Sequence, residues 1–171
     1  MLRNIARAGS LMLALFAVTV MALVLHHESP ATDPTPLFQG ARIDASTLAL
    51  FQRSCQNCHS GNTHWPWYSR IPPASWVIAK DVHEARAHLN LSHWNSYGAE
   101  QQESLLTQIG SVVRTGRMPL SRYTLLHRDA VLTETERRQV YEWSRAEKKR
   151  LRAAGTGSAG PIGKPEGELK K

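Results

Sequence analysis

An all-α fold is the class that the sequence predicts, and three observations support it. Apolar residues recur at helical spacing in several segments after residue 43, and no segment alternates apolar and polar residues over the length of a strand. Glycine and proline residues separate these segments, as they do between helices. The 171 residues are enough for one compact domain with extensions.

The first helix expected in the domain leads into the two cysteines of the chain. Asp44 or Ser46 can cap its N-terminus, because short polar side chains accept hydrogen bonds from the unpaired first amides of a helix. Its apolar positions follow helical spacing at Leu48, Phe51 and Cys55. Residues 60–75 are rich in proline and large aromatic residues, so we expect a loop there.

Three further helices are expected, over residues 75–89, over 99–114 and after Thr133. The helix over 99–114 stops at Gly116, because glycine readily adopts the left-handed conformation that follows a helix. Thr133 and Glu136 form a capping box, in which each side chain accepts from the other residue's amide. The apolar stripe of the last helix is expected at Val140, Trp143 and Leu151.

The chain divides into four regions by composition. We assign residues 1–27 to a signal anchor or signal peptide, 28–42 to a proline-rich tether, 43–152 to the domain and 153–171 to a disordered tail.

The first region has the charge order of an export signal. Two arginines precede the apolar run Leu11–Leu25, in which Thr19 is the polar residue. The run is long for a signal peptide and no clean cleavage site follows, so we expect an uncleaved helix in a bacterial cytoplasmic membrane, with the domain facing the periplasm. The alternative is a soluble periplasmic domain after signal cleavage. The membrane is thus one expected partner.

The net charge of +7 raises the question of nucleic-acid binding. The excess charge lies mainly in Arg137–Arg152, without interleaved aromatic residues or a nucleic-acid motif, so no nucleic-acid partner is expected. This segment fits an acidic redox partner or anionic lipid better, and a solvated helix face is the simplest interpretation.

Cys55-Gln56-Asn57-Cys58-His59 has the pattern of a c-type haem attachment site. Two thiols three positions apart can each form a thioether with one haem vinyl group, and the imidazole that follows can then bind the iron. We therefore expect one covalent haem c, held by Cys55 and Cys58, with His59 as the proximal iron ligand.

Three other uses of this motif were weighed. A disulfide between the two cysteines would close a very short loop and add little stability. A thiol-redox pair is typical of a strand-helix-strand context, which is absent here. A zinc site needs two further ligands, and the remaining histidines do not show metal-site spacing.

Met118 is the expected distal iron ligand. It stands between Gly116 and Pro119, which favour a loop that presents the thioether, and the other methionines lie in the export segment. A soft thioether favours ferrous iron and raises the reduction potential. The alternatives are that Met118 only packs against the haem, that His127 is the ligand, or that the sixth position is open.

The sequence resembles the bacterial haem-binding domain family, which is related to class I cytochromes c. Over residues 45–145 the resemblance rests on the attachment motif, on Trp65-Pro66-Trp67-Tyr68-Ser69, and on Pro73-x-Ser75-Trp76, Leu89-Asn90-x-Ser92-x-Trp94, Gly116-x-Met118-Pro119, Tyr123, His127, Leu132-Thr133-x-x-Glu136-Arg137 and Trp143. Leu120 departs from it, since a second proline is expected there. The resemblance implies a cytochrome c-like helical domain around covalent haem, exported and often membrane-tethered. We expect Trp65, Trp67 and Tyr68 to form part of the haem pocket and to exclude water.

Two functions follow from a single haem. A filled sixth position and the lack of an acid-base cluster favour an electron carrier, not an enzyme, that exchanges electrons with unidentified redox partner proteins. The alternative is a haem sensor or peroxidase-like enzyme with a displaceable sixth ligand, in which His127 or His64 acts on the distal side. A thiol-redox or zinc module is the third, haem-free interpretation.

Overall fold

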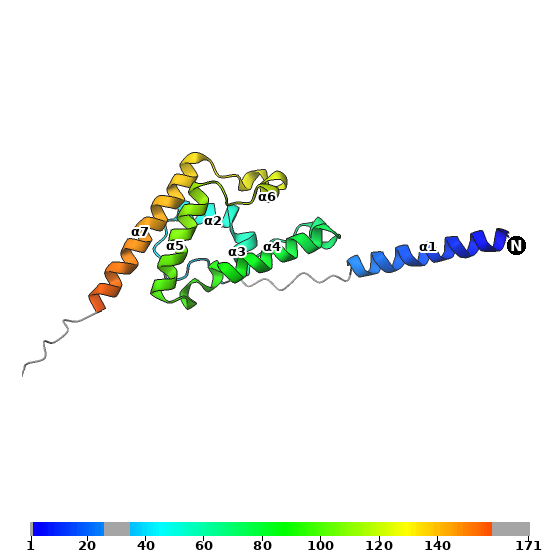
Figure 1. The fold of residues 1–171 in the computed structure, drawn as a ribbon, viewed down its shortest axis with the longest axis horizontal. Coiled ribbons are helices and arrows are strands. Elements are labelled where there is room, and N and C mark those ends of the chain that lie inside the picture. Colours follow the sequence, from blue (N-terminus) through cyan, green and yellow to red (C-terminus); the bar gives the residue numbers. More distant parts are fainter. Residues whose placement is uncertain (1, 26–34, 159–171) are drawn as a thin grey trace, which may run out of the picture.

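The fold is all-helical over the part of the chain that the computed structural model describes, residues 2–25 and 35–158 (Figure 1). Every regular element in these two stretches is a helix. The elements in chain order are α1 (Leu2–Leu25), α2 (Ala45–Ser54), α3 (Gln56–His59), η1 (Trp67–Arg70), α4 (Ala74–His88), η2 (Leu91–Ser96), α5 (Ala99–Arg114), α6 (Ser121–Leu126), η3 (Arg128–Ala130) and α7 (Glu134–Ser158). The predicted fold class is confirmed at this level.

The predicted helix ends are confirmed where local side-chain chemistry defines them. Asp44 caps α2 by accepting from the Thr47 amide at 2.9 Å. At the start of α7, the Thr133 amide donates to Glu136 Oε2 at 2.7 Å, and the Glu136 amide donates to Thr133 Oγ1 at 3.3 Å. Gly116 follows α5 with φ of 69°, the left-handed region that favours glycine.

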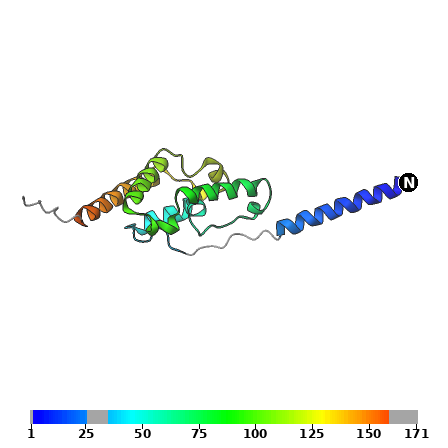
Figure 2. The same cartoon turned by 60° about the horizontal axis from the view of Figure 1, so that its bottom comes forward.

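Helices α5 and α7 lie side by side, as both Figure 1 and Figure 2 show. Gly110 of α5 permits this close approach, because a Cβ atom at this position would lie 2.7 Å from Ser144 Oγ of α7. The core behind this pair is strongly aromatic. Phe38 packs edge-on against Phe51, Trp94 and Trp143, with ring centroids 4.6, 5.1 and 4.9 Å away.

Phe38 lies in the segment that the sequence predicted to be a tether, and the structure corrects this assignment. Its side chain is only 1% exposed, and its amide donates to the Leu91 carbonyl at 3.0 Å. Burial of a phenylalanine side chain stabilises a fold by roughly 1.5–3 kcal/mol, which favours docking of this segment over a free tether. The folded part therefore starts before residue 43.

The other region boundaries differ or lie outside the described residues. Helix α7 continues to Ser158, beyond the predicted start of the tail at residue 153. The rest of that predicted tail, residues 159–171, lies outside the described part of the chain, as do residues 26–34 of the predicted N-terminal regions.

The predicted membrane anchor is wrong. Over the described residues, no helix has both the length and the apolar character needed to cross a bilayer. The apolar run Leu11–Leu25 within α1 covers fifteen residues. The membrane is therefore not retained as a partner through this helix.

Candidate functional site

One cavity of about 490 Å³ collects the residues singled out by the sequence. It is lined by side chains of α2, α3, α4, α5 and the segment 118–123, and by Leu89 and Leu91 after α4. Cys55, Cys58, His59 and Met118 all line it. Its volume lies within the ~300–1,000 Å³ usual for cofactor and small-molecule sites. Residues far apart in the sequence thus meet at one place.

His59 is fixed in a form able to bind a metal. Its Nδ1–H donates to the Leu89 carbonyl at 3.1 Å, which leaves Nε2 with a free lone pair. Burial lowers the pKa of His59, while the bond to Leu89 acts in the opposite direction. The side chain is therefore favoured as the neutral imidazole that ligates metals, and it is oriented by a backbone carbonyl as metal-binding histidines usually are.

The two cysteines are protonated thiols in this environment. Burial, with a smaller contribution from the neighbouring Cys58, raises the pKa of Cys55 to about 12. Burial is also the main cause of the raised pKa of Cys58, with a further contribution from Asp81. A reactive thiol-redox pair requires the opposite, a lowered thiol pKa. Both cysteines are free, so no disulfide joins them.

A zinc site also finds no support in the described part of the chain. No group of three or more histidine, cysteine, aspartate or glutamate side chains gathers there in a way that could hold a metal ion. Of the candidate ligands that the sequence singled out, the cavity holds one imidazole, two thiols and one thioether. This set matches an iron porphyrin attached through cysteines better than a bare divalent metal.

Met118 is brought to the cavity by the end of α5. The amides of Arg117 and Met118 both donate to the Val112 carbonyl, at 2.9 and 3.2 Å. The Met118 side chain is partly buried and packs against the core. These contacts fix the backbone that carries the thioether.

His127, the alternative ligand, does not line the cavity. Its Nδ1–H donates to the Tyr123 carbonyl at 3.1 Å, and its Nε2 lies 3.2 Å from the Tyr68 hydroxyl. Both ring nitrogens are therefore occupied by protein partners. The geometry favours Met118 over His127, and the ligand assignment itself stays a prediction.

Trp65, Trp67 and Tyr68, the aromatic block, are not among the residues that line the cavity, and their role in a haem pocket stays a prediction. The Trp67 side chain is 76% exposed, and the Tyr68 hydroxyl is paired with His127. The block forms the loop and the short helix η1, which packs near the start of α4. Proline residues on both sides prevent a longer helix that could carry these rings inward.

Aliphatic and charged side chains line the cavity in place of the aromatic block. Helix α5 supplies the apolar wall with Leu105, Ile109, Val112 and Val113. Helix α4 contributes Asp81, Glu84, Ala85 and His88, and the segment after Met118 adds Arg122 and Tyr123. The α4 residues recur at helical spacing, a signal that sequence reasoning could have used. Tyr123 is one of the residues that carry the family resemblance, whereas no pattern in the neighbouring sequence indicates that Arg122 lines the cavity.

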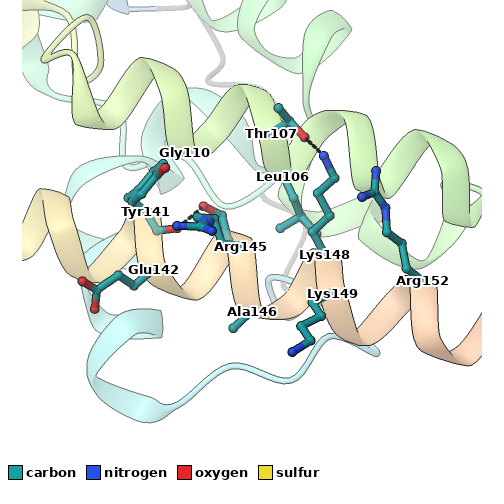
Figure 3. Close-up of a pocket in the computed structure, with 11 residues that line it drawn as sticks. Leu106, Thr107, Gly110, Tyr141, Glu142, Arg145, Ala146, Lys148, Lys149 and Arg152 are labelled. Atoms are coloured by element: carbon teal, nitrogen blue, oxygen red, sulfur yellow. Dashed lines mark hydrogen bonds between the residues drawn. The ribbon is translucent and has the colours of Figure 1, made fainter.

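A second hollow, of about 610 Å³, lies between α5 and α7 (Figure 3). Basic side chains of α7 dominate it, and Lys148 reaches across to donate to Thr107 of α5 at 2.6 Å. The described residues that line it include no cysteine, histidine or methionine and none of the residues of the first cavity. The larger hollow is therefore not the cofactor site, and it forms part of the basic surface expected for Arg137–Arg152.

The fold and the site define a small helical domain with a cavity that Cys55, Cys58, His59 and Met118 line. A family model described as a haem-binding domain matches residues 14–146, which is more than half of the chain. The chain therefore belongs to the haem-binding domain family, and its cofactor is haem. No curated protein and no solved structure matches the chain.

Proposed function

We propose that the protein carries one covalently attached haem and transfers single electrons, as c-type cytochromes do. One observation supports this most strongly: the attachment motif and Met118, 59 residues further along the chain, line the same cavity. In this proposal Cys55 and Cys58 hold the haem through thioethers, and His59 and Met118 are its axial ligands.

Haem supplies a one-electron couple at its iron, and the side chains of the cavity adjust it. The carbonyl of Leu89 orients His59 and increases the basicity of its imidazole. The thioether of Met118 favours the ferrous state. The aliphatic wall from α5 excludes water, which disfavours the oxidised, more highly charged form of the site.

The sensor or peroxidase-like alternative is less well supported. Such a site needs an open or displaceable sixth position, and the sequence predicts His127 or His64 on its distal side. His127 is bonded at both ring nitrogens, and His64 is exposed and does not line the cavity. The electron carrier therefore fits the geometry better.

We also propose that the domain acts outside the cytoplasm. The proposal rests on the order of two arginines and an apolar run near the N-terminus, which is typical of export. Fractionation of cells that express the full chain tests this independently of haem chemistry. Recovery of the haem-loaded protein from the cytoplasmic fraction alone would refute it.

Spectroscopy of the full chain, expressed with haem-attachment machinery, tests the main proposal. We expect a Soret band, haem that stays with the chain on a denaturing gel, and slow, incomplete carbon monoxide binding by the reduced protein. Replacement of both Cys55 and Cys58 by alanine should abolish covalent retention. Haem lost from the wild-type chain on the gel contradicts covalent attachment, and rapid, complete carbon monoxide binding contradicts a closed electron carrier.

A further inference from the structure

Helix α6 follows Met118 directly, yet burial does not hold it in place. None of its residues is buried, and Leu125 and Leu126 are 64% and 69% exposed. Figure 1 shows α6 away from the α5–α7 pair that contains much of the core. A helix of six residues is also too short to be stable by itself. Specific side-chain contacts must therefore position it.

The first of these contacts joins α6 to α4. The Arg122 guanidinium donates to both carboxylate oxygens of Asp81, from Nε at 2.9 Å and from Nη2 at 2.6 Å. This two-pronged geometry fixes direction as well as distance. Both side chains line the cavity, so the pair lies at the site itself and joins two of its walls.

The second contact joins α6 to the attachment motif. Asn57, between the two cysteines, donates through Nδ2 to the Tyr123 hydroxyl at 2.9 Å. The Tyr123 ring stacks on His127 at 4.1 Å, and His127 in turn meets the Tyr68 hydroxyl. Asn57 also accepts the His64 amide through Oδ1 at 3.0 Å, so its side chain has a defined orientation.

Met118 thus lies between two anchors. The Val112 carbonyl holds its own amide on one side, and the contacts to Asp81 and Asn57 hold α6 on the other. We propose that Asp81 and Asn57 are positioning residues. They hold α6 against α4 and the attachment motif and thereby keep the Met118 thioether on the haem iron. This inference rests on the proposed function, in which Met118 is the distal ligand.

Loss of either contact should shift Met118 toward its dissociated state. A partly exposed ion pair stabilises a structure by roughly 0.2–1 kcal/mol, and a neutral hydrogen bond by about 1 kcal/mol. We therefore expect each variant to bind an external ligand about 1.4- to 5-fold faster or more completely. The histidine ligand and both thioethers are untouched, so covalent haem content should not change.

The experiment compares Asp81→Asn, Arg122→Gln and Tyr123→Phe in the haem-loaded full chain. Carbon monoxide binding to the reduced form and imidazole binding to the oxidised form report on the sixth position. Hydrogen exchange of the α6 amides reports on the helix itself. Arg152→Gln is the matched control, because it breaks an ion pair of similar side-chain exposure, between Arg152 of α7 and Glu103 of α5, and neither residue lines the cavity.

Faster ligand binding and faster α6 exchange in all three variants, with the control unchanged, support the proposal. The double variant Asp81→Asn/Arg122→Gln should then bind ligands no faster than either single variant, because both substitutions remove the same ion pair. Variants that bind both ligands as slowly as the wild type, with unchanged exchange of the α6 amides, overturn the positioning role. They leave the electron-transfer proposal standing. A wild-type protein that binds carbon monoxide at once overturns both.

Discussion

Met118 is the residue on which the redox behaviour of the proposed site depends most. It is the methionine that lines the cavity, and the end of α5 fixes its backbone. A thioether is a soft ligand that favours ferrous iron, whereas an imidazole favours the ferric state more. The identity of this one side chain therefore has a direct electronic consequence.

Met118→His should lower the reduction potential and keep a six-coordinate haem. The physical reason is the exchange of a soft sulfur for a harder nitrogen on the same side of the iron. Redox titration against the wild type measures the change, and the far-red ferric absorption of sulfur ligation should disappear. His64→Ala is the control and should leave both properties unchanged, since His64 is exposed and does not line the cavity. Equal potentials for wild type and Met118→His would exclude Met118 as the ligand.

Asp44 governs the acid stability of α2. The Ser46 hydroxyl, followed by the Thr47 amide, holds the pKa of this carboxyl well below its ordinary value. The stabilisation is complete above the unfolded pKa near 4 and is lost as the pH falls through the lower folded pKa. Asp44→Ala should cost about 1 kcal/mol at neutral pH through loss of the cap.

Asp44→Asn distinguishes the effect of the helix cap from that of the carboxylate charge, because it keeps the cap and removes the charge. Its amide oxygen can still accept from the Thr47 amide, so neutral stability should fall less than in Asp44→Ala. Its stability should also depend less on pH below 4, because no carboxyl titrates there. Urea unfolding curves at several pH values measure both effects. If Asp44→Asn and the wild type lost stability in parallel on acidification, other carboxyls would govern the acid response.

At the scale of elements, the sequence predicts best those helices whose ends depend on neighbouring residues. Asp44, the Thr133–Glu136 box and Gly116 each act within a few positions, and the structure places the helix ends accordingly. Phe38 was misassigned to a tether because its surroundings come from distant segments. The same holds for α6, whose contacts with Asp81 and Asn57 span 41 and 66 positions.

Gly110 shows that the α5–α7 contact is tight. Alanine in a helix interior is ordinarily more stabilising than glycine by roughly 0.5–1 kcal/mol. Here the added Cβ would lie 2.7 Å from Ser144 Oγ and 3.2 Å from Tyr141 Cδ2. We expect Gly110→Ala to lower the free energy of unfolding by about 1–2 kcal/mol, because overpacking outweighs the helix preference.

Thermal and denaturant unfolding measure this effect, and two variants make it specific. Gly155→Ala adds a Cβ in α7 with no atom within 4 Å and should not destabilise the protein. Gly110→Ala/Ser144→Ala removes the closest clashing atom and should recover part of the loss. A single Gly110→Ala variant as stable as the wild type would show that the two helices can separate without cost.

At the scale of the molecule, we expect the two sides of the cavity to differ in stability. On one side, α5 and α7 are joined through Gly110 and the aromatic core around Phe38 and Trp143. On the other side, α4, the attachment motif and α6 meet mainly across the cavity and through polar contacts. Haem would contact both sides, so binding should stabilise the second side most.

In the Cys55→Ala/Cys58→Ala variant, prepared free of haem, the helices should therefore lose stability to different extents. Amides of α4 and α6 should exchange much faster than in the haem-loaded protein, because the cavity then holds no apolar partner for their side chains. Amides in the middle of α5 and α7 should change little, since their mutual packing needs no haem. Hydrogen exchange followed by mass spectrometry resolves the two sides within one sample. Uniform acceleration across all helices would show instead that haem is required for the whole fold, as a structural metal is in the smallest domains.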